Sequence, residues 1–293
     1  MRKQMGERVD KRNQPGSLPY IWRRISKNPG AMFGLILLCL MMIICFLSPL
    51  IMKYDYAALD MTRRYATPSW EHPFGCDQVG RDIMSRIFYG ARYTLGIGVG
   101  AVALALVLGV TIGAAAGYMG GKVDTVLMRI LDVIQSFPGL VLSIAVVTTL
   151  GAGVRNTIIA IGIAYAPAFA RLMRANIISI RGSEFIEAAT TINCSTFRII
   201  ARHLFPNAVS PLIVQISLQI ANAGITASSM SFLGLGVQEP APEWGAMIAG
   251  ARNYLRQSPH MVLFPGLFIM ITVLSLNLVG DALRDALDPK LRD

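Results

Sequence analysis

Six long apolar runs constrain this chain more than any other feature of its sequence. They lie at about 31–52, 93–118, 126–150, 156–173, 208–233 and 261–280. A helix needs roughly 20 apolar residues to cross the hydrocarbon core of a bilayer, and these runs approach or pass that length. A chain that is 54% hydrophobic and only 15% charged is also too apolar for an ordinary soluble domain. The runs therefore predict an all-α membrane protein with six transmembrane helices.

The Lys and Arg residues are distributed unevenly among the segments that flank these runs. If the N-terminus lies in the cytoplasm, the inner segments hold 18 of them and the outer segments hold 9. Cytoplasmic loops of membrane proteins carry an excess of Lys and Arg, so we expect both termini in the cytoplasm. Most of the net charge of +10 follows from this topology, which argues against a nucleic-acid partner.

The sequence contains no recognisable catalytic or metal-binding pattern. Its four cysteines and three histidines lack the spacing of a zinc site. The stretch GYMGGKV at 117–123 resembles a phosphate loop, but Ala116 replaces the first glycine and Val123 replaces the Ser or Thr that binds magnesium. We therefore expect no enzymatic activity, no bound cofactor and no bound metal. If ATP energises this protein, ATP and Mg must bind to partner subunits.

A hydrophilic stretch separates the fourth and fifth apolar runs, and it reads GSEFIEAATTINCSTFRIIARHLFP over 182–206. Ser183 is a suitable N-cap for a first helix. Asn193 would end this helix because Asn tolerates the left-handed turn. A second amphipathic piece at 197–202 then leads to the break at Pro206. We expect two short helices outside the membrane that present a surface to a partner.

Polar residues recur along the fifth apolar run at spacings of 4, 3, 4 and 3, which corresponds to one face of a helix. They are Gln215, Gln219, Asn222, Thr226 and Ser229. Polar side chains inside a membrane normally face the bundle interior, a partner helix or a water-filled path. Periodicity alone leaves two interpretations equally open, hydrogen bonding between helices and the lining of a path.

The second apolar run carries a small residue at every fourth position. These residues are Ala101, Ala105, Gly109, Gly113 and Gly117. A ridge of small residues lets two helix backbones approach closely, so it predicts a helix-packing surface.

Asp132 is the one carboxylate that falls clearly inside a predicted span. An acid within a membrane is costly and often functional. Arg129 lies three positions earlier, near enough on a helix for a local ion pair. We favour a structural pair with Arg129, and a proton or substrate role is the alternative.

The stretch 182–206 resembles the EAA loop of ABC importer permeases. The tripeptide EAA stands at 187–189, a turn residue follows four positions later where the family usually has glycine, and a proline closes the loop. In that family this loop forms the coupling helix that docks on a cytoplasmic ATPase. The resemblance therefore implies ATPase docking through Glu184, Glu187, Ala188, Ala189, Asn193 and Pro206.

Three further stretches resemble the C-type permease of the dipeptide/oligopeptide/nickel branch of this family. They are HPFGCDQVGRDIMSRIFYGAR at 72–92, SFLGLGVQEPAPEWGAMI at 231–248 and GDALRDALDPKLRD at 280–293, with Cys76 at a position where Thr is usual. The resemblance implies a type I importer in a bacterial or archaeal cytoplasmic membrane. Its implied partners are a homologous second permease, two cytoplasmic ATPase subunits and an extracytoplasmic substrate-binding protein. It also favours a translocation path along the fifth run.

We expect two domains with a boundary near residue 90. Residues 1–90 would comprise a cytoplasmic tail, the first span and a long outer segment, and 91–293 would form a five-helix domain that carries the coupling loop. The resemblance implies a peptide cargo and leaves glutathione, nickel chelates and opines open. A stand-alone secondary transporter or channel is the alternative class, and Asp132 is its only candidate coupling residue.

Overall fold

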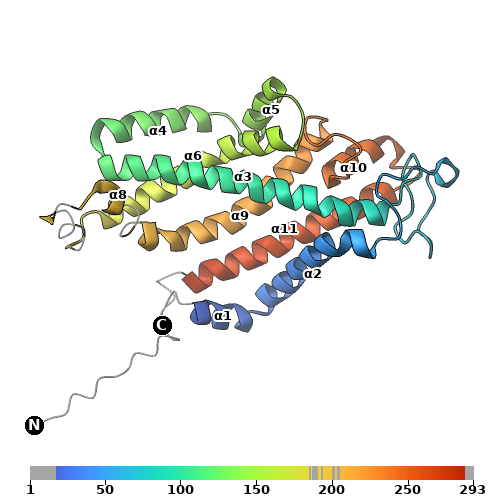
Figure 1. The fold of residues 1–293 in the computed structure, drawn as a ribbon, viewed down its shortest axis with the longest axis horizontal. Helices are drawn as coiled ribbons and strands as arrows, with labels where there is room; N and C mark the ends of the chain where they lie inside the picture. The colour runs from blue at the N-terminus through green and yellow to red at the C-terminus, as the bar shows by residue number, and fades with distance from the viewer. Residues whose placement is uncertain are drawn as a thin grey trace, which may run out of the picture.

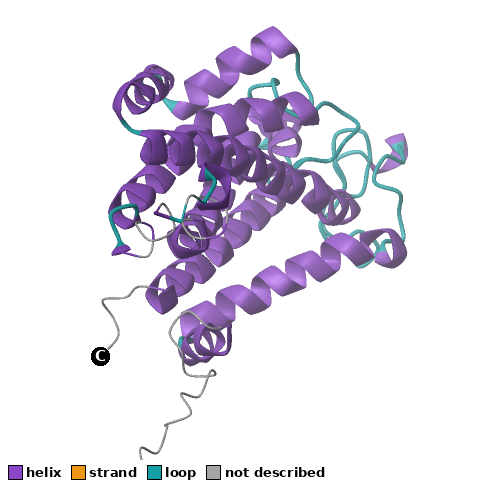
Figure 2. Ribbon diagram, turned by 60° about the vertical axis from the view of Figure 1, so that its left-hand side comes forward, coloured by secondary structure: helices purple, strands orange, loops and turns teal. Residues whose placement is uncertain are grey.

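The computed structural model describes residues 18–184, 186, 191–192, 194–199, 202 and 205–287. Within these residues every named element is a helix, and the only β-type pairing is an isolated bridge between Cys76 and Asp82. Long helices run roughly along one direction, and most loops gather at one end of the bundle (Figures 1 and 2). The predicted all-α class is confirmed for the described part of the chain.

The α-helices are α1 (Leu18–Lys27), α2 (Pro29–Ile51), α3 (Ile83–Met119), α4 (Gly121–Gln135), α5 (Gly139–Leu150), α6 (Val154–Ile180), α8 (Thr196–Ile199), α9 (Phe205–Phe232), α10 (Trp244–Ala251) and α11 (His260–Leu287). Short 3-10 turns lie at η2 (Met61–Arg63) and η4 (Arg252–Tyr254). Helix starts follow capping chemistry: Asn28 caps α2 through the amide of Ala31, and Asp82 caps α3 through the amide of Ser85.

Among the residues that the structure describes, four helices are long and apolar enough to cross a membrane, namely α2, α3, α6 and α11. The pair α4 and α5 passes the same test only when taken together, and it is bent by 88° at the break between them. The prediction of one continuous helix over 126–150 is therefore wrong. Pro138 explains the break, because proline has no backbone N–H and disfavours helical geometry at the preceding residue.

Helix α3 begins ten residues before the predicted start of the second span. Its 37 residues correspond to a length of about 55 Å, at about 1.5 Å per residue. That length exceeds the ~30 Å hydrocarbon core, so α3 extends well beyond it. The extra turns belong to the stretch that the sequence assigned to the outer segment, and α3 continues without a break across residue 90. The proposed division into two domains stays a prediction.

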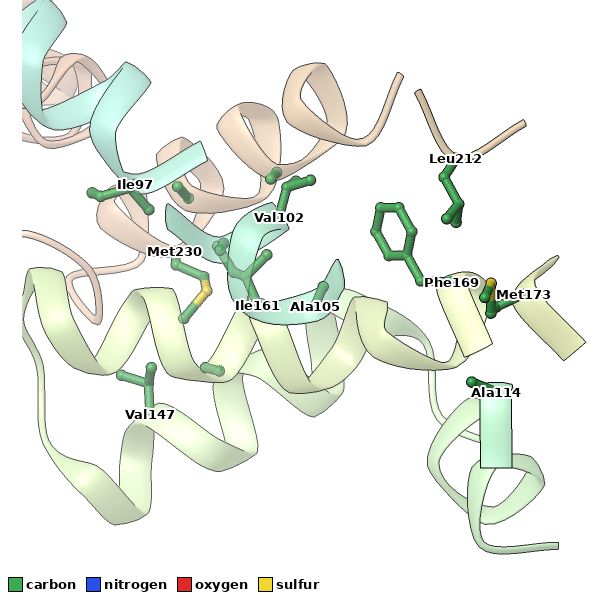
Figure 3. Close-up of a cluster of buried hydrophobic side chains, with 14 of the residues drawn as sticks. Ile97, Val102, Ala105, Ala114, Val147, Ile161, Phe169, Met173, Leu212 and Met230 are labelled. Carbon is green, nitrogen blue, oxygen red and sulfur yellow. The ribbon is translucent and has the colours of Figure 1, made fainter. Parts of the chain in front are cut away.

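The main hydrophobic core lies between α3, α6 and α9 (Figure 3). Phe169, Met173 and Ile161 of α6 are fully buried there beside Ala105 of α3 and Met230 of α9.

The small-residue ridge of α3 lies against α6. A Cβ atom added at Gly109 would come within 2.6 Å of the carbonyl oxygen of Ala166, and one at Gly117 within 3.0 Å of that of Arg174. Gly113 is equally tight against the backbone of Ala170, and Ala105 is fully buried. Because no larger side chain fits, the ridge sets how closely α3 and α6 approach.

Candidate functional site

The polar stripe of α9 lies beside the face of the helix that packs in the core. Asn222 is exposed, and the side chains of Gln215, Gln219, Thr226 and Ser229 are partly accessible. The adjacent face of the helix is apolar, and its residues Leu212, Ala223, Ala227 and Met230 are buried in the core. Helix α9 therefore presents an accessible polar surface along about four turns.

The hydrogen bonds of this stripe bear on the two interpretations that the sequence left open. The Thr226 hydroxyl lies 2.8 Å from the hydroxyl of Tyr165 on α6. Asn222 donates a long bond of 3.4 Å to Gln219, and Ser229 bonds back to the carbonyl of Ile225. Within the described part of the chain, only the Thr226 bond links this stripe to another helix through side chains. The stripe therefore contributes little hydrogen bonding between helices of this chain.

The segment after α6 is described only in part. Glu187, Ala188, Ala189 and Asn193 lie outside the described residues, so the structure gives no placement for these predicted docking residues. Glu184 is exposed, and Pro206 lies in the first turn of α9.

Two apolar side chains anchor this segment in the bundle. Ile186 is 3% exposed and Ile199 is 1% exposed, and both belong to the same core cluster as Phe169 and Met173. Ile192 lies between them in the sequence and is 75% exposed. The described residues of this segment therefore include both apolar attachments to the α3–α6–α9 core and an exposed apolar side chain.

Charged contacts hold α6 against its neighbouring helices at the end of the bundle that carries the segment at 182–206. The guanidinium of Arg174 donates two hydrogen bonds to the carboxylate of Asp124 on α4, with Nη2 lying 2.6 Å from Oδ2. Arg181 donates to the backbone carbonyl of Gly117 on α3 at 3.0 Å. These contacts fix α6 to both neighbouring helices next to the segment at 182–206.

Asp132 pairs with a residue that the sequence did not suggest. Its Oδ1 accepts a hydrogen bond of 2.8 Å from Nη2 of Arg171 on α6, and both side chains are about half exposed. The expected local pair with Arg129 is therefore wrong, although the expectation of an ion pair holds. The folding back of α4 along α6 decides the partner, because it brings together residues 39 positions apart.

A second polar site lies at the opposite end of the bundle, where the segments predicted to be outer meet. Nε of Arg81 lies 2.6 Å from Oδ2 of Asp77, and Nη2 of Arg81 lies 3.0 Å from Oε1 of Glu239. Arg86 donates to the backbone carbonyl of Tyr56 at 3.1 Å. The hydrogen bonds from Arg81 lower the pKa of Glu239 below its ordinary value. This network joins the segment before α3 to the segment before α10.

Glu243 is a buried carboxylate that the sequence analysis missed. It is 0% exposed, and it accepts hydrogen bonds from the hydroxyls of Thr94 and Ser228 and from the amide of Ala246. The next residue, Trp244, is also fully buried and donates from its indole to the carbonyl of Ile87. One short stretch therefore fixes α3, α9 and α10 together. The available signal was an acidic residue at the start of an apolar helix, which is the pattern of an N-cap.

The described residues hold no group of His, Cys, Asp and Glu side chains that could bind a metal ion. His72 is instead buried within the outer segment, where Nδ1 lies 2.8 Å from Oδ1 of Asp82. Burial raises the pKa of the Cys76 thiol to about 11, so this thiol is protonated at neutral pH. The chemistry at both ends of the bundle is hydrogen bonding and ion pairing, which positions helices.

Comparisons with known proteins agree with this architecture. Residues 109–293 match the family described as "binding-protein-dependent transport system inner membrane component", and residues 19–68 match the "N-terminal TM domain of oligopeptide transport permease C". Long apolar helices and these matches define a multi-pass transport permease of the inner membrane, a class without catalytic activity of its own.

The chain belongs to the binding-protein-dependent transport permease family, as a DppC/OppC-like C-type subunit. It is 44% identical to the dipeptide transport system permease protein DppC of Alkalihalophilus pseudofirmus, over 92% of this chain and 89% of the relative. It is 43% identical to the glutathione transport system permease protein GsiD of Pectobacterium atrosepticum, over 92% of this chain and 90% of the relative.

A solved structure shows the same fold at low sequence identity. The inward-facing MetNI methionine ABC transporter contains a chain that matches with a TM-score of 0.57 and 17% identity, over 70% of this chain and 97% of that chain. The helix arrangement described above is therefore that of an ABC transporter permease.

Proposed function

We propose that this chain forms half of the translocation pathway of an ATP-driven importer for dipeptides or oligopeptides. A homologous second permease would complete the pathway, two cytoplasmic ATPases would bind ATP and Mg, and a substrate-binding protein would deliver the cargo. Peptide cargo is supported by the 44% identity with a dipeptide permease. Glutathione is the second candidate, because a glutathione permease is almost equally similar.

One observation carries the proposed pathway, namely the accessible polar face of α9. A helix in hydrocarbon would be expected to bury such groups or bond them to neighbouring helices, since unpaired polar groups are costly there. Gln215, Gln219 and Asn222 instead remain accessible along one side of α9. Water and a second permease on that side would satisfy them, and together they would create a path for a hydrated peptide.

The coupling mechanism follows from the attachment of the segment at 182–206. Closure of the ATPases would move this segment, which we propose contacts them through Glu184 and the residues at 187–193. Ile186 and Ile199 are buried in the α3–α6–α9 core, so the helices would move with the segment as a rigid body. Such movement would alternate the access of the α9 polar face between the two sides of the membrane.

We further propose six spans, with α4 and α5 forming one broken span, α9 the fifth, and both termini in the cytoplasm. The excess of Lys and Arg in the proposed inner segments supports this orientation. Labelling of single cysteines introduced at Trp70 and Ile192 with a membrane-impermeant maleimide tests it in intact cells. We expect labelling at position 70 from outside and labelling at 192 only after lysis, and the reverse pattern would overturn the orientation.

Uptake by the purified complex in proteoliposomes tests the function. We expect ATP-dependent accumulation of a labelled dipeptide that stops when the ATPases are inactivated by mutation. Competition by excess unlabelled glutathione separates the two cargo candidates. Uptake that persists with the permease chain alone would overturn the importer proposal in favour of a secondary transporter or channel.

A further inference from the structure

A groove runs along the seam between α2 and α3, and its two ends differ in chemistry. The end near the middle of α2 is an apolar hollow of about 640 Å³, with walls that include Leu38 and Met42 of α2 and Val99 of α3. Its floor is formed by Ile220 of α9 and Leu276 of α11. Met42 and Val99 are both more than 40% exposed, so the hollow is open to its surroundings.

The other end of the seam is a polar hollow of about 290 Å³ at the outer end of the bundle. Lys53, Tyr54, Tyr56 and Tyr89 line it, beside the last turn of α2. The Tyr56 and Tyr89 rings stack with their centroids 4.1 Å apart, and Nζ of Lys53 lies 5.1 Å from the centroid of Tyr54. Aromatic residues of this kind favour the membrane–water interface, where one part of the ring is apolar and the other part meets water.

Asp55 also lines the polar hollow. Its Oδ1 accepts a hydrogen bond of 2.7 Å from the backbone amide of Ala57, which occupies one of its carboxylate oxygens locally.

Arg92 joins the two hollows. It lines the apolar hollow, and its guanidinium lies 5.2 Å from the centroid of Tyr89, which lines the polar hollow. Nε of Arg92 donates to the carbonyl of Cys45 at 2.8 Å. Pro49 has no N–H with which to satisfy that carbonyl within α2, so Arg92 and the Ser48 hydroxyl, which lies 3.0 Å away, donate to it instead. A positive charge is thereby fixed part-way along the seam.

The same stripe of each helix lines both hollows. On α2 the stripe runs outward from Leu38 through Met42 and Cys45 to Met52, and on α3 it runs outward from Val99 to Ser85. The two helices converge toward the end of the bundle that carries the loops (Figure 1). The fourteen residue steps from 38 to 52 correspond to about 21 Å of helix. That length is about half of the ~40–45 Å thickness of a whole bilayer, which is the depth of one leaflet.

We propose that this groove binds one anionic phospholipid of the leaflet at the outer end of the bundle. The acyl chains would occupy the apolar hollow, and the phosphate would lie between Arg92 and Lys53. Three features support this occupant. The groove is as long as one leaflet is deep, its apolar and polar hollows follow the order of acyl chains and headgroup, and Arg92 and Lys53 carry positive charges that suit a phosphate. The proposal depends on the chain being a membrane permease and not on the identity of its cargo.

Gly96 provides a direct test, because it lines the apolar hollow and a Cβ added there meets no atom within 4 Å. The Gly96→Leu variant would fill the hollow without disturbing the packing. Gly266 on α11 also has no atom within 4 Å of an added Cβ and lies outside both hollows, so Gly266→Leu is the matched control.

The measurement is photo-crosslinking of the whole transporter complex in nanodiscs that contain phosphatidylglycerol with a diazirine in its acyl chain. We expect labelled peptides from 38–46 and 95–99 in the wild type and in Gly266→Leu, and a loss of this labelling in Gly96→Leu. Equal labelling in the wild type and Gly96→Leu would overturn the proposal. Absence of lipid labelling in the wild type, with the second permease covering the seam, would overturn it as well.

A second variant tests the headgroup without altering the hollow. Lys53 is exposed at the polar end, and Lys53→Glu is expected to reduce labelling by the phosphatidylglycerol probe by at least about fivefold, since one basic residue contributes ~1 kcal/mol near anionic lipid. Labelling by a phosphatidylcholine probe should change less. An equal effect on both probes would refute the preference for an anionic lipid.

Discussion

Arg81 and Glu239 lie 158 positions apart in the sequence, and their side chains meet through two hydrogen bonds of 3.0 and 3.3 Å. Arg81 is 4% exposed, whereas the side chain of Glu239 is 56% exposed. The guanidinium also binds Asp77, so it holds the outer segment before α3 against the segment that leads into α10. Trp244 at the start of α10 donates a hydrogen bond to Ile87 of α3. The contact between Arg81 and Glu239 is therefore part of a continuous set of contacts that joins these segments to α3.

We predict that the two sides of this contact differ strongly in their contribution to stability. Arg81→Ala should lower the free energy of unfolding by about 3–5 kcal/mol, because it leaves the buried carboxylate of Asp77 without its closest partner. Glu239→Gln should cost less than about 1 kcal/mol, because solvent screens an exposed charge. Thermal unfolding of the detergent-purified chain measures both, and equal losses would contradict the assignment.

The same contact predicts an acid-sensitive contribution to stability. The folded pKa of Glu239 lies below its ordinary value of 4.5, so its stabilisation is complete above that value and is lost as the pH falls through the folded pKa. Unfolding midpoints of wild type and Glu239→Gln should therefore differ above pH 4.5 and converge below it. A difference between the two that stays constant with pH would show that Glu239 contributes nothing through its charge.

The ridge on α3 predicts opposite effects for two glycine substitutions. Gly109→Ala should destabilise the chain by about 1–3 kcal/mol, because the added Cβ meets the backbone of α6. Gly266→Ala should be neutral or stabilising by about 0.5 kcal/mol, since the site is open and alanine is a better helix former. Unfolding midpoints in the same detergent provide the comparison. Similar shifts of the unfolding midpoint in both variants would contradict the close packing of α3 against α6 at Gly109.

The buried anchor at Ile199 predicts a loss of coupling between ATP hydrolysis and transport. Ile199→Ala removes core contacts worth about 2–5 kcal/mol, and it should loosen the segment at 182–206 from the bundle. We expect the reconstituted complex to take up less peptide for each ATP hydrolysed. Ile178→Ala is the control, because Ile178 of α6 is exposed and lies outside the proposed ATPase contact. If Ile199→Ala takes up as much peptide for each ATP hydrolysed as the wild type, the movement of the segment is not transmitted to the helices through Ile199.

The exposed pair between Asp132 and Arg171 predicts a minor structural role. Asp132→Asn should cost no more than about 1 kcal/mol, because exposed ion pairs are weak. Uptake by the reconstituted complex should keep its rate and its dependence on pH. Loss of uptake in an intact, stably assembled complex would instead support a proton-coupling role for Asp132 and the secondary-transporter alternative.

The class of the chain and the faces of its helices can be predicted from the amino-acid sequence. Long apolar runs can be satisfied in a bilayer only by helices, and the spacing of Gln215, Gln219 and Asn222 fixes one face because a helix repeats every 3.6 residues. Such features are local, so they can be seen without knowing which helix lies beside which. The motifs at 72–92 and 231–248 were visible for the same reason, although their contacts were not.

Contacts between residues that are distant in the sequence depend on how the helices pack in three dimensions. The turn at Gly120 and Gly121, where both residues have positive φ, folds α4 back along α6, so Asp132 meets Arg171 and not Arg129. The approach of α10 to α3 and α9 buries Glu243 among donors that are up to 149 positions away in the sequence. Periodicity along one helix carries no information about such distant partners, because their pairing depends on how separate helices pack in space.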